Sequence, residues 1–293
     1  MRVLIVGASG LVGSHCLTQF KLADWEVVGT HLNFATEDTV FFNPEFIGNE
    51  SEGAFSVRAF MPDVIVHCGA LTNVDYCELH SDISEEGTLT PTKHLVAYCK
   101  QYGVKLIYIS TDYVFDGLSG PYIETAIVNP INVYGKHKLQ CEQLTTELSD
   151  FIILRITNVY GEEVRSKNFI ARLIQSFQTN ESKTITLPTD QFATPIYAGD
   201  MARLAVLLLK DNKRGIYHIA STDFYTRYQL ALKVKSYFPN NTSIQFLGIK
   251  TTELNQPAKR PLYGGLLNIK ISLEYPQFEF VNIDSFLQKN ILI

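Results

Sequence analysis

The sequence predicts an α/β protein with a doubly wound parallel sheet and a smaller C-terminal substrate lobe. Apolar, strand-sized runs alternate with segments of helical period through the first half of the chain, and the pattern loosens after about residue 160. Nearly continuous hydrophobicity is typical of strands that are covered on both faces, as in parallel sheets. Alternation of such strands with helices favours a doubly wound sheet.

Five apolar runs are predicted as strands, at residues 2–6, 26–30, 63–68, 105–110 and 151–156. Helices are predicted at residues 11–21, 91–101, 136–148 and 201–210. For the second of these helices we expect Thr90 as the N-cap, Pro91 in the first turn and Gly103 at the end. We expect residues 1–160 to form a dinucleotide-binding domain to which residues 184–220 return. Residues 161–183 and 221–293 are expected to form the substrate-binding lobe.

The composition narrows the class of function. The 293 residues carry a formal net charge of −5 and contain no cluster of Lys and Arg. The sequence therefore gives no sign of a nucleic-acid partner. The apolar runs are too short to span a membrane, and the N-terminus does not resemble a signal peptide. Five cysteines without a CxxC pair favour reduced thiols in a cytoplasmic protein, and the seven histidines show no metal-ligand spacing, so no metal site is expected.

A glycine-rich turn follows the first predicted strand and opens the first predicted helix. Gly7, Gly10 and Gly13 bracket Leu11 and Val12 in a GxxGxxG spacing. Glycine permits a close approach of the backbone to a pyrophosphate, which then lies on the helix N-terminus. A tight turn without a ligand is the alternative, but the position between strand and helix favours a cofactor site in a Rossmann-like domain.

The end of the second predicted strand bears on the form of the cofactor. A carboxylate at this point normally binds the ribose hydroxyls of NAD. Here Thr30 and His31 stand instead, with neither an acid nor an arginine. We therefore expect NADP or NAD with a preference for NADP, and we leave open that His31 is a solvated loop residue.

A tyrosine and a lysine four residues apart are the candidate catalytic pair. Tyr134 and Lys138 lie on one face at the start of a predicted helix. A neighbouring ammonium favours the phenolate, so we expect Lys138 to lower the pKa of Tyr134. Thr111 follows another strand, at the edge where open α/β sheets bind ligands, and its hydroxyl can hydrogen-bond a substrate carbonyl. An ordinary i,i+4 surface pair and a capping threonine are the alternatives.

Several motifs together resemble those of one enzyme family. The stretches GASGLVG, STDYVFDG, PYIET, NPINVYGKHK, LRITNVYG and DQFATP are similar to those of the extended short-chain dehydrogenases/reductases, and among these to the dTDP-4-dehydrorhamnose reductases. The resemblance extends to about Asp200 and returns at Arg260, which matches an arginine near the substrate in that family. A solvated loop charge is the alternative for Arg260.

The resemblance implies a role for each matching residue. Tyr134 would donate the proton, Lys138 would hold the cofactor, and Thr111 would orient the carbonyl. The residues implied at the pyrophosphate are Gly10, Leu11 and Val12, and those at the nicotinamide are Ala70, Leu71 and Thr72. The residues implied at the sugar are Thr111, Asp112, Asn158 and Arg260.

Three positions depart from the family pattern. Thr88 stands where an asparagine is usual, Asn158 replaces an aromatic residue that packs on the sugar, and Val40 replaces an acid near the adenine. These departures affect the helix geometry, the identity of the sugar and the adenine contact, respectively.

The leading functional hypothesis is NAD(P)H-dependent reduction of a 4-keto nucleotide sugar, with dTDP-4-dehydrorhamnose as the first candidate. An epimerase or dehydratase is less favoured, because Tyr113 follows Asp112 where similar dehydratases have a glutamate. A third hypothesis is a regulatory NADP-binding subunit, since the chain also resembles the β subunit of methionine adenosyltransferase. We expect a small-molecule nucleotide-sugar partner, and we leave a homodimer open.

Overall fold

A parallel sheet forms the centre of the protein. The structure is a computed structural model that describes residues 1–51, 53–179 and 182–291. Within these residues the main sheet has seven strands in the order β3-β2-β1-β4-β5-β6-β9. They are β1 (Arg2–Val6), β2 (Glu26–His31), β3 (Thr39–Phe41), β4 (Val64–His67), β5 (Lys105–Thr111), β6 (Phe151–Ile156) and β9 (Gly215–Ile219). The predicted doubly wound parallel sheet is confirmed.

Strand β1 lies at the point where the order of the sheet reverses. Val3 pairs with Val27 of β2 on one side and with Val64 of β4 on the other, and both pairings are parallel. The connections that leave β1 and β4 therefore diverge at their carboxyl ends. Open α/β sheets bind their ligands in the crevice that forms at such a switch point.

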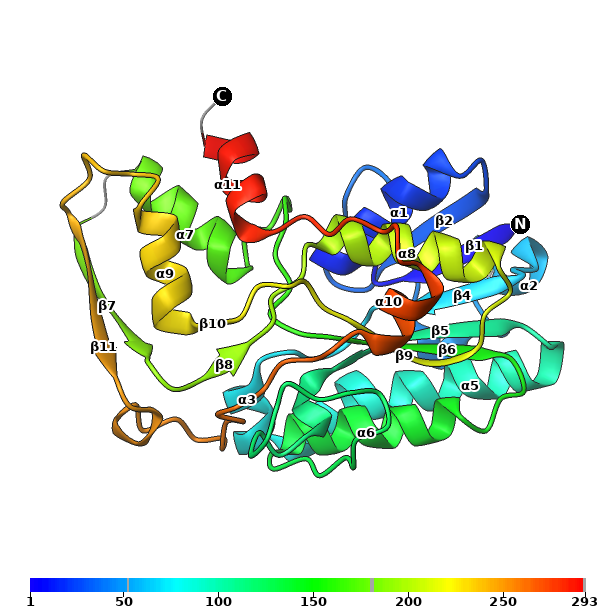
Figure 1. The fold of residues 1–293 in the computed structure, drawn as a ribbon. Helices are drawn as coiled ribbons and strands as arrows, with labels where there is room; N and C mark the ends of the chain where they lie inside the picture. Colours follow the sequence, from blue (N-terminus) through cyan, green and yellow to red (C-terminus); the bar gives the residue numbers. More distant parts are fainter. Residues whose placement is uncertain (52, 180–181, 292–293) are drawn as a thin grey trace.

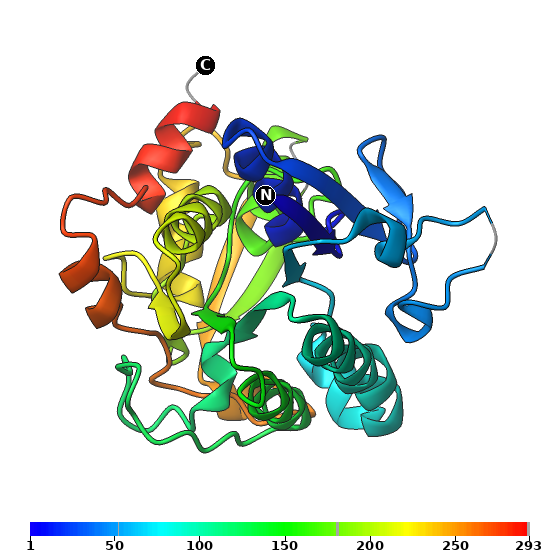
Figure 2. The same ribbon diagram turned by 90° about the vertical axis from the view of Figure 1, so that its right-hand side faces the viewer.

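Helices cover both faces of this sheet (Figure 1, Figure 2). Helices α1 (Leu11–Leu22) and α8 (Ala198–Lys210) pack together on one face, where Phe20 and Leu204 are fully buried. Helices α5 (Thr90–Tyr102) and α6 (Val133–Thr145) lie on the other face, where Leu95 packs against Ile65. The short helices nearby are α2 (Val57–Phe60), α3 (Val74–Leu79) and α4 (Ser81–Ser84).

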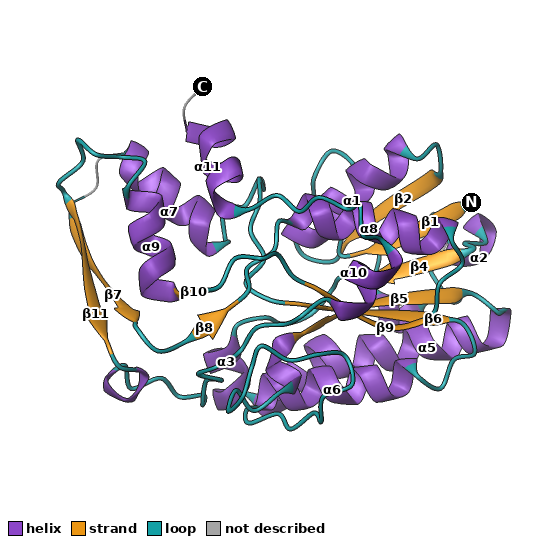
Figure 3. Cartoon of the chain, in the orientation of Figure 1, coloured by secondary structure: helices purple, strands orange, loops and turns teal. Residues whose placement is uncertain are grey.

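A second group of elements lies beyond the carboxyl ends of the parallel strands (Figure 1, Figure 3). Here β7 (Lys183–Pro188) pairs with β11 (Ile244–Ile249), and a separate hydrophobic cluster includes Phe177, Val234 and Phe286. The helices that contribute to this cluster are α7 (Phe169–Gln178), α9 (Arg227–Lys235) and α11 (Ile283–Ile291). The remaining elements are β8 (Phe192–Ala193), β10 (Tyr225–Thr226) and α10 (Ile269–Glu274).

The division of the chain into two domains stays a prediction. Residues 184–220, which were predicted to return to the dinucleotide-binding domain, contribute to both groups of elements. Within residues 184–220, α8 and β9 belong to the layers of the main sheet, whereas β7 pairs with β11. Across the described residues, none of the helices combines the length and the apolar character needed to cross a bilayer.

Two helix starts differ from the prediction. Thr90 is not an N-cap, because the chain is already helical through a π-helical turn at Glu85–Leu89. Helix α6 begins at Val133, three residues before the predicted start, since the side chain of Asn132 caps it by accepting a hydrogen bond from the Gly135 amide. Gly103 does end α5, in the left-handed conformation.

Candidate active site

The glycine turn forms a cradle that side chains would fill. A Cβ on Gly7, whose φ is +86°, would lie 2.9 Å from the Gly69 amide nitrogen, and a Cβ on Gly13 would lie 2.3 Å from the Gly7 carbonyl oxygen. Gly10 is the N-cap of α1 and has no side chain over the first helical amides. The turn therefore leaves those amides, including those of Leu11 and Val12, available to an anion such as a dinucleotide pyrophosphate.

The end of β2 presents His31 rather than Thr30. Thr30 is fully buried, and its hydroxyl donates to the Ile5 carbonyl at 3.2 Å. Its own carbonyl accepts from the Ala8 amide at 2.7 Å, which holds the glycine turn. His31 is half-buried, and its Nδ1 lies 2.8 Å from the Thr39 hydroxyl. Of the two residues that were predicted at the adenosine ribose, only His31 has a side chain that is accessible there.

Thr88 anchors the loop on the predicted nicotinamide side. This loop, residues 70–72, follows β4, and its Leu71 amide donates to the Thr88 hydroxyl at 3.1 Å. Thr88 lies in the π-helical turn, and its carbonyl accepts a second hydrogen bond from Thr92 at 2.8 Å. The threonine that replaces the usual asparagine therefore still connects the helix to the loop.

The start of α6 brings Tyr134 against the turn that follows β5. Thr111 ends β5 and caps the short 3-10 turn Asp112–Val114 by accepting a hydrogen bond from the Tyr113 amide at 3.2 Å, and its side chain lies close to the Tyr134 phenol. The rings of Tyr113 and Tyr134 meet edge to face, with centroids 5.7 Å apart. The approach is close because Gly135 lacks a side chain: a Cβ there would lie 2.2 Å from the Tyr113 carbonyl oxygen.

Lys138 is buried behind this pair. Its Nζ donates to the Ile109 carbonyl at 2.6 Å and lies 4.2 Å from the centre of the Tyr108 ring. Burial lowers the pKa of Lys138 to about 8. Burial also raises the pKa of the Tyr134 phenol, and the nearby Thr111 side chain offsets this only in part. The expected net lowering of the Tyr134 pKa is therefore not found, because desolvation of the phenol dominates.

Asp112 is held by hydrogen bonds within the protein. One carboxylate oxygen accepts from the Thr157 hydroxyl at 2.7 Å and from the Gly265 amide at 3.2 Å, and the other accepts from Thr111 at 3.3 Å. Burial raises the pKa of Asp112, while the hydrogen bond from Thr157 acts against this shift. The carboxylate thus joins β5 to β6 and to the C-terminal segment. Its contact with a sugar stays a prediction.

Arg260 is fixed by an ion pair with α3. Its Nη2 donates to Asp75 at 2.7 Å, and the same carboxylate accepts from the Ala258 amide at 3.1 Å. The Arg260 side chain is only 8% exposed, so the alternative of a solvated loop charge is wrong. Asn132 holds the same segment, because its side-chain amide donates to the Lys259 carbonyl at 2.8 Å.

Asn158 is hydrogen-bonded to an arginine that was not predicted from the sequence. Asn158 follows β6 in the left-handed conformation, with φ of +40°, and its side-chain oxygen accepts from Arg227 Nη2 at 3.1 Å. The Arg227 guanidinium lies 4.8 Å from the centre of the Phe169 ring. Arg227 follows the N-cap Thr226 at the start of α9, and no motif in the surrounding sequence marks it. Only the folding of the second group of elements brings it to this site.

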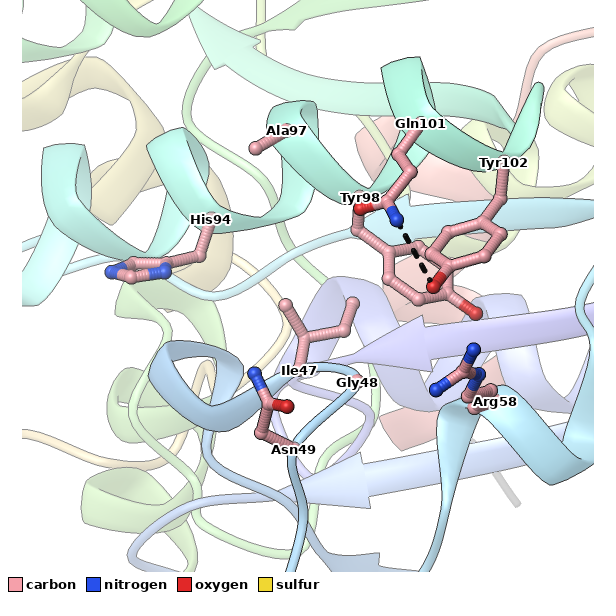
Figure 4. Close-up of a pocket in the computed structure, with 9 residues that line it drawn as sticks. All are labelled: Ile47, Gly48, Asn49, Arg58, His94, Ala97, Tyr98, Gln101 and Tyr102. Carbon is pink, nitrogen blue, oxygen red and sulfur yellow. Dashed lines mark hydrogen bonds between the residues drawn. The ribbon is translucent and has the colours of Figure 1, made fainter.

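A polar hollow elsewhere on the protein is separate from these residues. It has a volume of about 340 Å³ and lies between the loop after β3, α2 and α5 (Figure 4). Its lining residues include Asn49, Arg58, His94 and Gln101, and none of the predicted site residues is among them.

Comparison with known proteins places the chain in a family. Residues 1–280 match the family model described as RmlD substrate binding domain. The chain belongs to this family. This result confirms the family that was predicted from the sequence motifs.

Solved structures of RmlD-type reductases are similar to the chain. The dTDP-4-dehydrorhamnose reductase of Bacillus anthracis, in complex with NADP, is 26% identical with a TM-score of 0.85, and the match covers 99% of this chain and 98% of that chain. The corresponding enzyme of Clostridium acetobutylicum is 28% identical with a TM-score of 0.80, over 93% and 92% of the two chains.

Relatives with a different name are similar as well. Methionine adenosyltransferase 2 subunit beta of Danio rerio is 31% identical over 268 residues, which are 89% of this chain and 80% of that protein. The spore coat polysaccharide biosynthesis protein SpsK of Bacillus subtilis is 29% identical over 269 residues, which are 90% and 88% of the two chains. The chain is thus similar to proteins with different names.

Proposed function

We propose that this protein reduces the keto group of a 4-keto nucleotide sugar, with dTDP-4-dehydrorhamnose as the first candidate substrate and dTDP-L-rhamnose as its product. The observation that carries the proposal is that the Thr111 and Tyr134 side chains lie close together at the carboxyl end of β5, with Lys138 one helical turn away. Membership of the RmlD family and the likeness to dTDP-4-dehydrorhamnose reductases support it.

The cofactor of the proposal is NADPH or NADH, with a preference for NADPH. The cradle at Gly7, Gly10 and Gly13 fits a pyrophosphate, and Leu11 and Val12 supply helix N-terminal amides. Residues 70–72 would lie at the nicotinamide, and His31 would lie at the adenosine ribose. The NADP in the similar Bacillus anthracis structure agrees with this assignment. When bound, the dinucleotide supplies the hydride.

The residues of the chain supply the proton. Thr111 and Tyr134 would both hydrogen-bond the keto oxygen, which polarises the carbonyl. Because burial raises the pKa of Tyr134, the phenol is protonated at neutral pH and suits the role of proton donor. The alkoxide that hydride addition creates on the sugar is a stronger base than a phenolate and takes this proton. The buried ammonium of Lys138 would then stabilise the phenolate and hold the nicotinamide ribose.

The position after Asp112 offers no second acid for the removal of water, because a tyrosine stands there. Dehydration needs a general acid at the leaving hydroxyl, and Tyr113 occupies the position after Asp112. Burial raises the pKa of Tyr113, which makes this phenol a still weaker acid. Asp112, Asn158 and Arg260 would therefore bind the sugar without eliminating its hydroxyl.

Product mass tests the proposal. Purified protein is incubated with dTDP-4-dehydrorhamnose and either reduced dinucleotide, and the loss of nicotinamide absorbance is followed. A product with two more hydrogens than the substrate is expected. A panel of other 4-keto nucleotide sugars identifies the preferred sugar, and loss of water from a 4-hydroxy nucleotide sugar would contradict a pure reductase.

A second candidate is an NADP-binding regulatory subunit. The observation that favours it is the 31% identity to methionine adenosyltransferase 2 subunit beta over most of both chains. A protein that binds NADP, turns over no keto-sugar and co-elutes with a methionine adenosyltransferase while changing its activity would support this candidate over the reductase.

A further inference from the structure

Arg227 is a half-buried charge without a carboxylate partner. Among the ion pairs of the described residues, each of the paired arginines (Arg155, Arg203, Arg214 and Arg260) has an acidic partner, and Arg227 is not one of them. The guanidinium donates to the Asn158 amide oxygen and packs on Phe169. Partial burial lowers the pKa of Arg227, which reflects the cost of removing an uncompensated cation from water.

The charges around Arg227 leave a positive excess. Arg172 and Arg260 lie close enough to Arg227 to disfavour its charge, while Tyr113 and Asp112 favour it. Asp75 neutralises Arg260, and Asp112 is already held by Thr111, Thr157 and Gly265. Arg227, Arg172 and Arg260 thus outnumber the carboxylates Asp75 and Asp112, and neither Arg227 nor Arg172 forms an ion pair among the described residues.

This excess faces the candidate active site. Arg227 bonds to Asn158 at the end of β6, and its field reaches Tyr113, whose ring contacts Tyr134. Arg172 comes from α7, which packs against α9 beyond the carboxyl ends of the strands (Figure 1). Arg227 of the second group of elements thus lies at the candidate site of the main sheet, with Arg172 near it.

We propose that Arg227, with Arg172 beside it, binds an anionic oxygen-bearing group of the substrate and selects substrates that carry one. The planar guanidinium matches phosphate and carboxylate oxygens with paired hydrogen bonds. The anion has two sources: the diphosphate of the nucleotide, or a carboxylate on the sugar. The proposal rests on the proposed nucleotide-sugar site, but it concerns binding and does not require turnover.

Calorimetric titration of three probes distinguishes the two sources. The probes are dTDP, UDP-glucose and UDP-glucuronate, of which the last two differ in one sugar carboxylate. If the diphosphate is bound, Arg227→Met weakens the binding of all three probes by about ten- to a hundredfold. If the carboxylate is bound, Arg227→Met leaves dTDP binding unchanged and abolishes a wild-type preference for UDP-glucuronate over UDP-glucose.

Two further variants serve as controls. Arg214→Met removes an equal charge from a residue that pairs with Asp150, and we expect wild-type binding of all three probes. Arg172 is exposed, so Arg172→Met should fold even if Arg227→Met does not. We expect Arg172→Met to weaken the binding of the probes by about two- to fivefold. Arg227→Lys keeps the positive charge but loses the paired hydrogen-bond donors of the guanidinium. Its affinity for the probes should therefore lie between those of the wild type and Arg227→Met.

The proposal is overturned if a folded Arg227→Met protein binds the three probes as wild type does, or if the wild-type protein binds none of them. A protein that shows the expected Arg227 effect but reduces no keto-sugar retains the anion site, and it contradicts only the proposed reductase activity.

Discussion

At the scale of single residues, the buried ammonium of Lys138 should make the free energy of unfolding depend on pH. Burial lowers its pKa from an ordinary value of 10.5 to about 8, so the native state binds fewer protons than the unfolded chain between these values. The charged form costs free energy below about pH 8, and this cost is relieved as the pH rises towards 10.5. Relative to Lys138→Met, the wild-type free energy of unfolding should therefore rise by up to about 3 kcal/mol between pH 7 and 10.

Urea unfolding of the two proteins across this pH range measures the effect of Lys138. Groups that are common to both proteins cancel in the difference between their free energies. A difference that does not depend on pH would show that Lys138 titrates in the folded protein as it does in an exposed lysine.

Loss of the Tyr134 phenol hydroxyl should impair turnover without unfolding the protein. Tyr134→Phe removes the proposed proton donor but keeps the ring that packs against Tyr113. Turnover of the keto-sugar should fall by about 10²–10⁴ with little change in stability. Tyr102→Phe, at the exposed end of α5, is the matched control and should retain full turnover. Near-wild-type activity of Tyr134→Phe would remove Tyr134 from the mechanism.

The sequence predicts some site residues better than others. Thr111, Tyr134 and Lys138 lie in local motifs that end one strand and begin one helix, so their neighbours along the chain determine their placement. Arg227 could not be predicted, because its position depends on how α9 packs against α7 and the end of β6. The burial of Thr30 was missed for a related reason: its hydroxyl bonds to the Ile5 carbonyl of β1, a residue that is far from it in the sequence.

At the scale of elements, a buried ionic network holds α6 against the sheet. Glu142 of α6 accepts two hydrogen bonds from Arg155 Nε, at 3.0 and 3.3 Å, and one from Nη2 at 2.7 Å. Arg155 of β6 also contacts His218 of β9, whose Nδ1 lies 3.0 Å from the Tyr122 carbonyl. Burial lowers the pKa of His218 to about 3, so this histidine is neutral and accepts from the arginine.

Removing one partner of this network should be costly. Glu142→Gln leaves the buried Arg155 guanidinium without a counter-charge, and we expect a loss of about 3–5 kcal/mol in the free energy of unfolding. The double variant Glu142→Leu/Arg155→Met removes both charges and should recover much of this loss. Denaturant unfolding of Glu142→Leu, Arg155→Met and the double variant gives the coupling energy, and additive effects of the two substitutions would contradict a coupled pair.

Elements with a strong local signal could be predicted, and those that depend on tertiary contacts could not. The apolar strands β1 and β6 match their predicted bounds. The starts of α5 and α6 were misplaced, because a π-helical turn continues one helix and the Asn132 cap extends the other. Strands β3 and β9 were missed, since β3 is only three residues long and half-exposed, and β9 mixes glycine and histidine with apolar residues.

At the scale of the whole molecule, polar contacts tie the second group of elements and the C-terminal segment to the main sheet. Arg260 bonds to Asp75 of α3, the Lys259 carbonyl accepts from Asn132 at the start of α6, and the Gly265 amide donates to Asp112 after β5. Each of these contacts includes a predicted site residue or its direct neighbour in the sequence. The proposed nucleotide-sugar site therefore depends on the packing of distant parts of the chain, which a local motif does not encode.

The thermal stability of the whole molecule should report which dinucleotide, NADPH or NADH, the protein binds more tightly. A ligand that binds only the native state stabilises it by about 2.7 kcal/mol at a concentration a hundred times its Kd. Because β2 ends in His31 without a carboxylate, a 2′-phosphate meets no repulsion there, and NADPH and NADH should both raise the Tm, with a modest advantage for NADPH. His31→Asp should reverse this order, since a carboxylate binds ribose hydroxyls and repels the phosphate. Thermal unfolding with each dinucleotide, followed by fluorescence titration of the Kd, tests this expectation. A wild-type preference for NADH above about a hundredfold would mean that a residue other than His31 supplies the ribose contact.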